Sequence, residues 1–209
     1  EKLVLDNTED YEKIFSTSFD KELESLEEIT AKEQKMIGEM KIHGIELAAL
    51  VLKALKLKFP EYTVISAEEE IFEPVIDSPG DYDYKGFLDL VIKTPDGKYH
   101  IIDWKSCSWG WDIKRKTDKM VTYQLTYYKH FFCQKHNIDP TMVETYFGLL
   151  KRTAKKNRIE IFRVSSGPKK INNSLNVLNK AVYNIHNNNH PKNRLSCSKC
   201  EFRKTEWCP

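Results

Sequence analysis

Two short stretches decide the fold of this 209-residue chain: Gly86-Phe87-Leu88-Asp89 and Ile101-Ile102-Asp103-Trp104-Lys105. Both are expected to be strands, and Thr94-Pro95-Asp96-Gly97 between them is typical of a hairpin turn. Asp103 interrupts an apolar strand, and carboxylates are rarely buried unless they are paired or bind a metal. Because side chains alternate along a strand, Asp103 and Lys105 project from the same face.

This hairpin predicts a site with two carboxylates and a lysine. Carboxylates from adjacent strands can bind one hard divalent cation, and a lysine beside them can align a water or offset the charge of a phosphate. The alternative is a salt bridge between Asp103 and Lys105 at the sheet edge, with Asp89 in a polar turn. The spacing alone leaves both interpretations open.

Outward from the hairpin, hydrophobic periodicity predicts alternating helices and strands. We expect surface helices within 1–35, helices at 36–58, 118–136 and 169–186, and strands at 62–72, 84–93, 99–106, 143–150 and 159–164. Pro60 ends the first long helix, since the residue before proline avoids helical backbone angles. The order predicts an α/β fold with a mixed central sheet flanked by helices.

Asp89, Asp103 and Lys105 match the signature of the PD-(D/E)XK nuclease superfamily, an acidic residue and then Asp/Glu-x-Lys across a hairpin. Three further motifs resemble its RecB-like branch, which includes phage-type exonucleases and CRISPR adaptation nucleases. They are Ile42-His43-Gly44-Ile45-Glu46 on the first core helix, Gly86 to Asp89 on the second strand, and Gln124 with Tyr128 on the next helix.

The resemblance implies an αβββαβ restriction-endonuclease-like core with N-terminal helices and a Cys-containing C-terminal tail. We expect an N-terminal helical segment at 1–35, a nuclease core at 36–190, and a Cys-rich tail at 191–209 that packs on the same domain.

The resemblance also implies the roles of the site residues. Mg²⁺ or Mn²⁺ is expected on His43, Asp89, Asp103 and the carbonyl of Trp104, with Asp89, Asp103 and Lys105 catalytic. Glu46, Gln124 and Tyr128 are expected to support the site or bind DNA. His43, Gln124 and Tyr128 could instead be packing residues, and Glu46 could be only solvated. The family often has another acid on the first strand, for which Glu68, Glu69 and Glu70 all compete.

The charge distribution points to an anionic partner. Residues 1–150 hold 19 Lys/Arg and 28 Asp/Glu, whereas residues 151–209 hold 14 and 3, giving net charges of −9 and +11. Trp109 and Trp111 precede Lys114 and Arg115, a combination that can stack bases and contact the backbone of a single strand. The alternative for both tryptophans is packing of the loop. The basic turn at 151–158 is a second candidate phosphate contact.

Three cysteines lie near the C-terminus, at Cys197, Cys200 and Cys208. In related CRISPR adaptation nucleases a similar triplet joins an upstream cysteine to bind a [4Fe–4S] cluster, but residues 1–106 contain no cysteine. A fourth ligand could precede Glu1 or be Cys107, Cys133 or His190. An iron–sulfur cluster, Zn²⁺ and no metal all remain open.

The sequence predicts a Mg/Mn-dependent DNA nuclease, an exonuclease or end-processing enzyme in replication, recombination or repair. Its expected partners are DNA, single-stranded or with free ends, and replication or recombination proteins. The alternatives are a CRISPR adaptation-type nuclease and a nucleic-acid-binding module of a larger protein. No apolar run could span a bilayer and no secretory signal is visible, so we expect an intracellular, cytoplasmic protein of a bacterial, archaeal or phage-infected cell.

Overall fold

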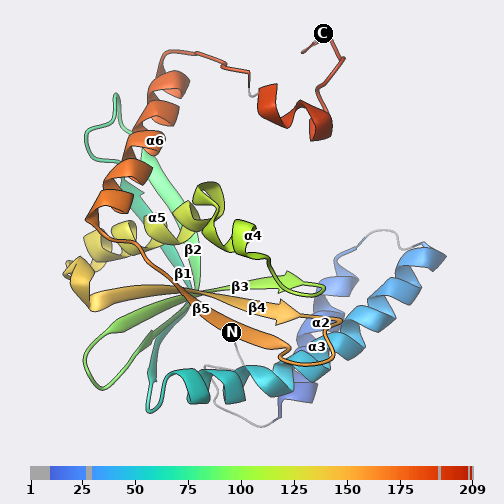
Figure 1. The fold of residues 1–209 in the computed structure, drawn as a ribbon. Coiled ribbons are helices and arrows are strands. Elements are labelled where there is room, and N and C mark those ends of the chain that lie inside the picture. The colour runs from blue at the N-terminus through green and yellow to red at the C-terminus, as the bar shows by residue number, and fades with distance from the viewer. Residues whose placement is uncertain (1–9, 27–29, 193, 207, 209) are drawn as a thin grey trace.

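The computed structural model describes residues 10–26, 30–192, 194–206 and 208, and a five-stranded sheet forms its centre (Figure 1). Its strands are β1 (Thr63–Pro74), β2 (Asp83–Lys93), β3 (Tyr99–Cys107), β4 (Val143–Lys151) and β5 (Ile159–Val164), in that order across the sheet. β3 and β4 run parallel, and the other neighbours are antiparallel. The predicted α/β fold with a mixed sheet is confirmed.

Helices flank the sheet and follow the predicted order. They are α2 (Tyr11–Glu24), α3 (Ala31–Lys58), α4 (Ile113–Thr117), α5 (Lys119–His136) and α6 (Pro168–His186), with short 3-10 segments η1 (Pro140–Met142) and η2 (Arg194–Lys199). The apolar pattern predicts that α3 starts at residue 36, but it starts at Ala31. The cause is a capping box, in which the Thr30 hydroxyl accepts from the Glu33 amide and the Glu33 carboxylate accepts from the Thr30 amide.

The two faces of the sheet bury separate apolar clusters. On one face, Leu55 of α3 and Phe59, just after the helix, pack on strand residues that include Leu90 and Ile102. On the other face, α5 packs on a cluster that includes Ile101. Successive side chains of a strand point to opposite faces, so Ile101 and Ile102 anchor β3 to both layers. Figure 1 shows the sheet between α3 and α5.

The sheet forks in its middle. β2 and β3 pair only over Leu90–Lys93 and Tyr99–Ile102, after which β2 stays with β1 and β3 stays with β4. The two arms are visible in Figure 1, where β1 and β2 point away from β3 and β4. The next residues in this register are Asp89 and Asp103. The fork therefore opens where the chain carries its two predicted catalytic acids.

The C-terminal segment follows α6, and Figure 1 draws η2 beyond the end of that helix, away from the sheet. The division of the chain at residues 35 and 190 stays a prediction. Within the described residues, no helix is long and apolar enough to cross a lipid bilayer.

We predict that Gly148→Ala destabilises the fold. Gly148 pairs with Trp104 across β3 and β4, and a Cβ there would lie 2.2 Å from the indole ring. Overpacking of this kind typically costs about 1–3 kcal/mol, which urea unfolding would measure.

Gly38→Ala is the matched control. Gly38 lies inside α3 with no atom within 4 Å of a new Cβ, so alanine should stabilise the helix by about 0.5–1 kcal/mol. Equal effects of the two substitutions would contradict the close packing of Trp104 on β4.

Candidate active site

The fork places two carboxylates side by side. The Trp104 amide, which has lost a strand partner on β2, donates to Oδ2 of Asp89 at 2.6 Å. The Lys105 ammonium lies 2.7 Å from Oδ2 of Asp103. Asp89, Asp103 and Lys105, which the sequence grouped, thus form one cluster on two diverging strands.

This cluster is electrostatically unfavourable for the two acids. Asp103 is only 1% exposed, and its burial, together with the charge of Asp89, raises its pKa to about 6 despite the nearby Lys105. Burial also raises the pKa of Asp89, against the hydrogen bond from Trp104. A bound cation would relieve both effects.

Glu68 is the carboxylate of β1 that stands beside the pair. Ala67 and Glu69 pair with Leu90 and Leu88, so Glu68 lies level with Asp89, and its charge further raises the Asp89 pKa. Its backbone has φ 52°, an unusual value for a non-glycine residue inside a strand.

The two neighbouring glutamates have other partners. Glu69 accepts from Lys135 at 2.8 Å and is 2.6 Å from the His136 ring, and Glu70 forms an ion pair with Lys85 at 2.8 Å. Of the three acids that the sequence left open, the structure therefore brings Glu68 to the acid pair.

α5 covers the acid pair from one face through Gln124 and Tyr128. The Gln124 side-chain amide donates to the Tyr128 hydroxyl at 3.0 Å, and burial together with the charge of Asp103 raises the Tyr128 pKa. Gly86 makes room for this ring, because a Cβ there would lie 3.1 Å from Tyr128. Packing thus explains why the Gly-x-x-Asp motif has a glycine at this position.

Tyr84 is a neighbour of the site that the sequence analysis missed. Its ring stacks on Phe131 at 4.2 Å and lies 3.2 Å from the position of a Cβ on Gly86. Burial, with smaller contributions from Tyr128 and Asp103, raises its pKa. The spacing Tyr84-x-Gly86 puts both residues on one strand face, which was the available signal.

The donor set fits a hard divalent cation. Oδ2 of Asp103 is buried, and the Lys105 ammonium lies 2.7 Å from it, without a hydrogen bond of ordinary geometry from any described residue. Those residues contain no group of three His, Cys, Asp or Glu side chains close enough to bind a metal. Mg²⁺ is commonly bound through one or two carboxylates, with water and substrate phosphate completing its shell, so the acid pair is sufficient.

Comparison with known proteins gives the family. A model of the PD-(D/E)XK nuclease superfamily matches residues 3–209. The chain belongs to this superfamily. Its members are nucleases that typically use Mg²⁺ or Mn²⁺. Asp89, Asp103 and Lys105 at the fork are the residues that the sequence analysis matched to the superfamily signature.

A solved structure supports the fold. A "Putative exonuclease" from Eubacterium rectale matches with a TM-score of 0.51 and 14% identity, covering 91% of this chain and 69% of that one. A protein designated SSO0001 matches with a TM-score of 0.46 and 16% identity, covering 91% and 92%. The comparison with curated proteins found no match.

His43 and Glu46 of this PD-(D/E)XK protein both lie on α3. Glu46 forms an ion pair with Arg158 at 2.6 Å, which fastens the β4–β5 turn to α3. His43 is half-buried, and no hydrogen bond or ion pair joins it to Asp89 or Asp103 in the part of the chain that is described. Its role as a metal ligand, like that of the Trp104 carbonyl, stays a prediction.

The two tryptophans after β3 have different environments. Trp109 is 70% exposed. Trp111 packs against Phe147 at 5.0 Å, and the Arg115 guanidinium lies 4.6 Å above its ring. The structure therefore places Trp111 in the packing of the loop, with Arg115 over its ring, while Trp109, Lys114 and Arg115 are exposed.

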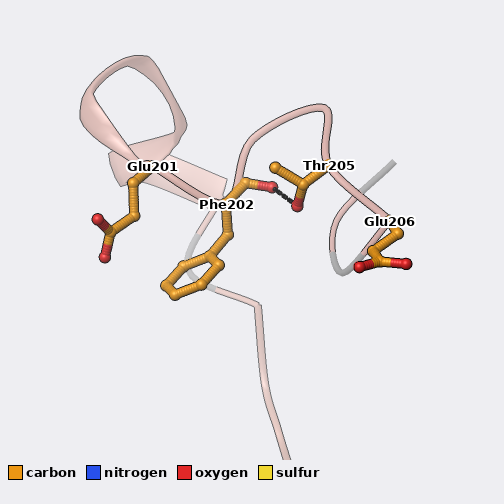
Figure 2. A pocket seen from close by; sticks show the side chains of 4 residues that line it. All are labelled: Glu201, Phe202, Thr205 and Glu206. Carbon is orange, nitrogen blue, oxygen red and sulfur yellow. Dashed lines mark hydrogen bonds between the residues drawn. The ribbon is translucent and has the colours of Figure 1, made fainter.

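The three cysteines of the tail lie in and after η2. The tail folds on itself, since the Thr205 hydroxyl donates to the Phe202 carbonyl (Figure 2) and the Lys204 amide donates to the Cys208 carbonyl. Of the other candidate ligands, Cys133 is buried in the core, which raises its thiol pKa to about 11 and makes it a poor ligand. A cluster or zinc at Cys197, Cys200 and Cys208 stays a prediction.

We predict that Asp103→Asn stabilises the metal-free protein at pH 7.5. The pKa of Asp103 is about 6 in the folded state against an ordinary 3.8, so the ionised form opposes folding. The wild type loses this stability as pH rises from about 4 to about 6, and the loss persists above about pH 6. The variant avoids the loss, so at pH 7.5 its free energy of unfolding should be higher than that of the wild type by on the order of 2 kcal/mol. This difference should vanish below about pH 4. Thermal unfolding with EDTA across this range measures it.

Mn²⁺ provides the second half of this test, because it should raise the Tm of the wild type more than that of Asp103→Asn. Asp96→Asn is the control: Asp96 is exposed and a hydrogen bond from Thr94 lowers its pKa, so its replacement should not stabilise the protein. A less stable Asp103→Asn variant at pH 7.5 without metal would contradict this description of the site.

Proposed function

We propose that this chain is a metal-dependent DNA nuclease that hydrolyses phosphodiester bonds, acting as an exonuclease or end-processing enzyme in replication, recombination or repair. The carrying observation is the proximity of Asp89 and Asp103 at the fork, where the charge of Asp89 acts on Asp103 and the Lys105 ammonium lies 2.7 Å from Oδ2 of Asp103. Replication or recombination proteins are the partners we expect.

Asp89 and Asp103 would hold the metal ion, and Glu68 adds negative charge beside them. When bound, Mg²⁺ or Mn²⁺ supplies Lewis acidity toward the phosphate and a water of lowered pKa. The desolvation of the two carboxylates supports this assignment, because it strengthens their attraction to a cation.

Lys105 is placed to act on the attacking water or the phosphate. Its side chain is 34% exposed although Asp103 is buried, so the ammonium can reach solvent and substrate while it stays on the acid pair. There it can orient a water and offset the charge that develops on the phosphate.

Tyr128 supplies a hydrogen-bond donor beside this group. Its hydroxyl accepts from Gln124, and its raised pKa keeps it protonated, so its own O–H remains available for a phosphate oxygen. The hydrogen bond between Gln124 and Tyr128 also supports the proposal that these two residues correspond to the helix motif of the RecB-like branch.

The region around Trp109 supports a single strand or free end as substrate. Trp109 and Lys114 are exposed immediately after β3, the strand that carries Asp103 and Lys105. Stacking on an exposed indole needs a base that is not held in a duplex.

The direct test uses Mn²⁺ with 5′- or 3′-labelled single- and double-stranded DNA. We expect a ladder of products from one end with the wild type, at least a hundredfold slower cleavage with Lys105→Ala, and unchanged DNA affinity, since Lys105 acts on the reaction.

Lys98→Ala is the control. Lys98 lies at the other end of the β2–β3 hairpin from Lys105, so this variant should cleave DNA at the wild-type rate. Binding without cleavage of any substrate would favour a nucleic-acid-binding module, and full activity of Lys105→Ala would contradict the proposed site.

We further predict that Trp109→Ala weakens single-strand binding about five- to hundredfold without changing the Tm, because one stacked base is lost. Trp111→Ala should lower the Tm instead, since this ring packs on Phe147. Fluorescence anisotropy with EDTA and thermal unfolding measure the two effects. Equal affinities for wild type and Trp109→Ala would remove this residue from the DNA surface.

A further inference from the structure

A groove of about 620 Å³ opens on the face of the sheet that α3 covers, between α2, α3 and the ends of β3 and β4. Its volume is in the range of small-molecule sites. Among the residues that line it are Phe15, Phe19, Ala48, Trp104 and Arg152. Figure 1 shows α2 and α3 lying together beside the end of β4.

Aromatic rings from two elements line this groove. Phe15 and Phe19 of α2 stack on each other at 5.6 Å and 28°. Trp104 lies over Gly148 of β4, where the missing Cβ lets the indole approach the strand closely. Flat apolar surfaces of this kind suit a planar ligand.

Arg152 adds a cation to the groove. Its Nε is buried and has no hydrogen-bond partner among the described residues, although such donors are normally paired. Its backbone is held on both sides, since its amide donates to the Cys107 carbonyl at 2.8 Å and its carbonyl accepts from Arg158 at 2.8 Å. Arg152 therefore lines the groove and carries a buried Nε–H that no described residue accepts.

The turn that follows Arg152 extends this positive charge. Lys151 and Arg158 form ion pairs with Glu160 and Glu46, whereas exposed Lys155 and Lys156 form none with any described residue. The occupant should therefore combine a flat apolar ring with negative charge.

The position of Trp104 relates the groove to the acid pair. Trp104 stands between Asp103 and Lys105 in the chain, and its amide is hydrogen-bonded to Asp89. The Trp104 side chain points to the groove on the α3 face. The side chains of Asp103 and Lys105 point to the opposite face, because successive side chains alternate along a strand. A ligand on the indole would therefore lie on the opposite face of β3 from the acid pair, with the β3 backbone between them.

We propose that this groove binds an unpaired nucleobase of the strand being cut, stacked against Trp104 and the α2 phenylalanines, with a phosphate of the same strand on Arg152. This inference rests on the proposed function and adds a base-binding subsite to it. Because the aromatic faces are not specific for one base, the subsite would require an unstacked nucleotide rather than a sequence.

The test measures binding of single-stranded 12-mers by wild-type protein in EDTA, so that it does not depend on cleavage. Each oligonucleotide has one abasic nucleotide, and its position is moved along the strand. We expect one position, or two adjacent ones, at which loss of the base weakens binding five- to hundredfold, which corresponds to the usual energy of one stacked base.

Variants of groove residues then test whether that base binds in the groove. Phe19→Leu removes one ring, and Ala48→Phe fills the groove; both should reduce the position-specific effect to less than twofold. Phe72→Leu is the matched control, because Phe72 is 58% exposed on β1 and is not part of the groove, and it should keep the effect. Phe19 lies on the surface helix α2, so this variant serves if Ala48→Phe does not fold.

Several outcomes would overturn the inference. They are an equal effect at every abasic position, a position-specific effect that both groove variants retain, and no binding of any single strand. A concentration-dependent increase in mass that Ala48→Phe abolishes would assign the groove to a second copy of the chain. Failure of the proposed function is distinguishable, because it would appear as absent cleavage with Mn²⁺ whatever the abasic scan shows.

Discussion

The early separation of β2 from β3 is the constraint on which the site depends. The two strands pair over four residues each, and the next pair in register would be Asp89 and Asp103. With a continued ladder, the Trp104 amide would bind the β2 backbone; instead it donates to the Asp89 carboxylate. The fork thus fixes one acid and leaves the other on the adjacent strand, with Lys105 beside it.

The packing on both sides explains why the fork is stable. Ile101 and Ile102 fix β3 to both apolar clusters just before the strands diverge, while β2 remains bonded to β1 and β3 to β4 along their lengths. The rigid arms hold the acids together although burial raises the pKa of both. In the proposed metal site, stability is given up locally for affinity toward a cation, as is common at catalytic sites.

Much of this could be predicted from the sequence. Alternating apolar residues and the hairpin turn predicted the strands, and the carboxylates at Asp89 and Asp103 with Lys105 predicted their cluster. The sequence could not choose among Glu68, Glu69 and Glu70, because the choice depends on the register of β1 and on the partners Lys135 and Lys85. The sequence also could not show that Trp111 is packed and Trp109 is exposed, because this difference depends on the position of Phe147.

The central claim is that the fork is a cation site. The most direct measurement is the anomalous diffraction of a crystal soaked in Mn²⁺. The account predicts a strong peak within bonding distance of carboxylate oxygens of both Asp89 and Asp103. A peak at the cysteine tail alone, or no peak at the fork when Asp89 and Asp103 are well ordered and the crystal is at pH 7.5, would contradict it.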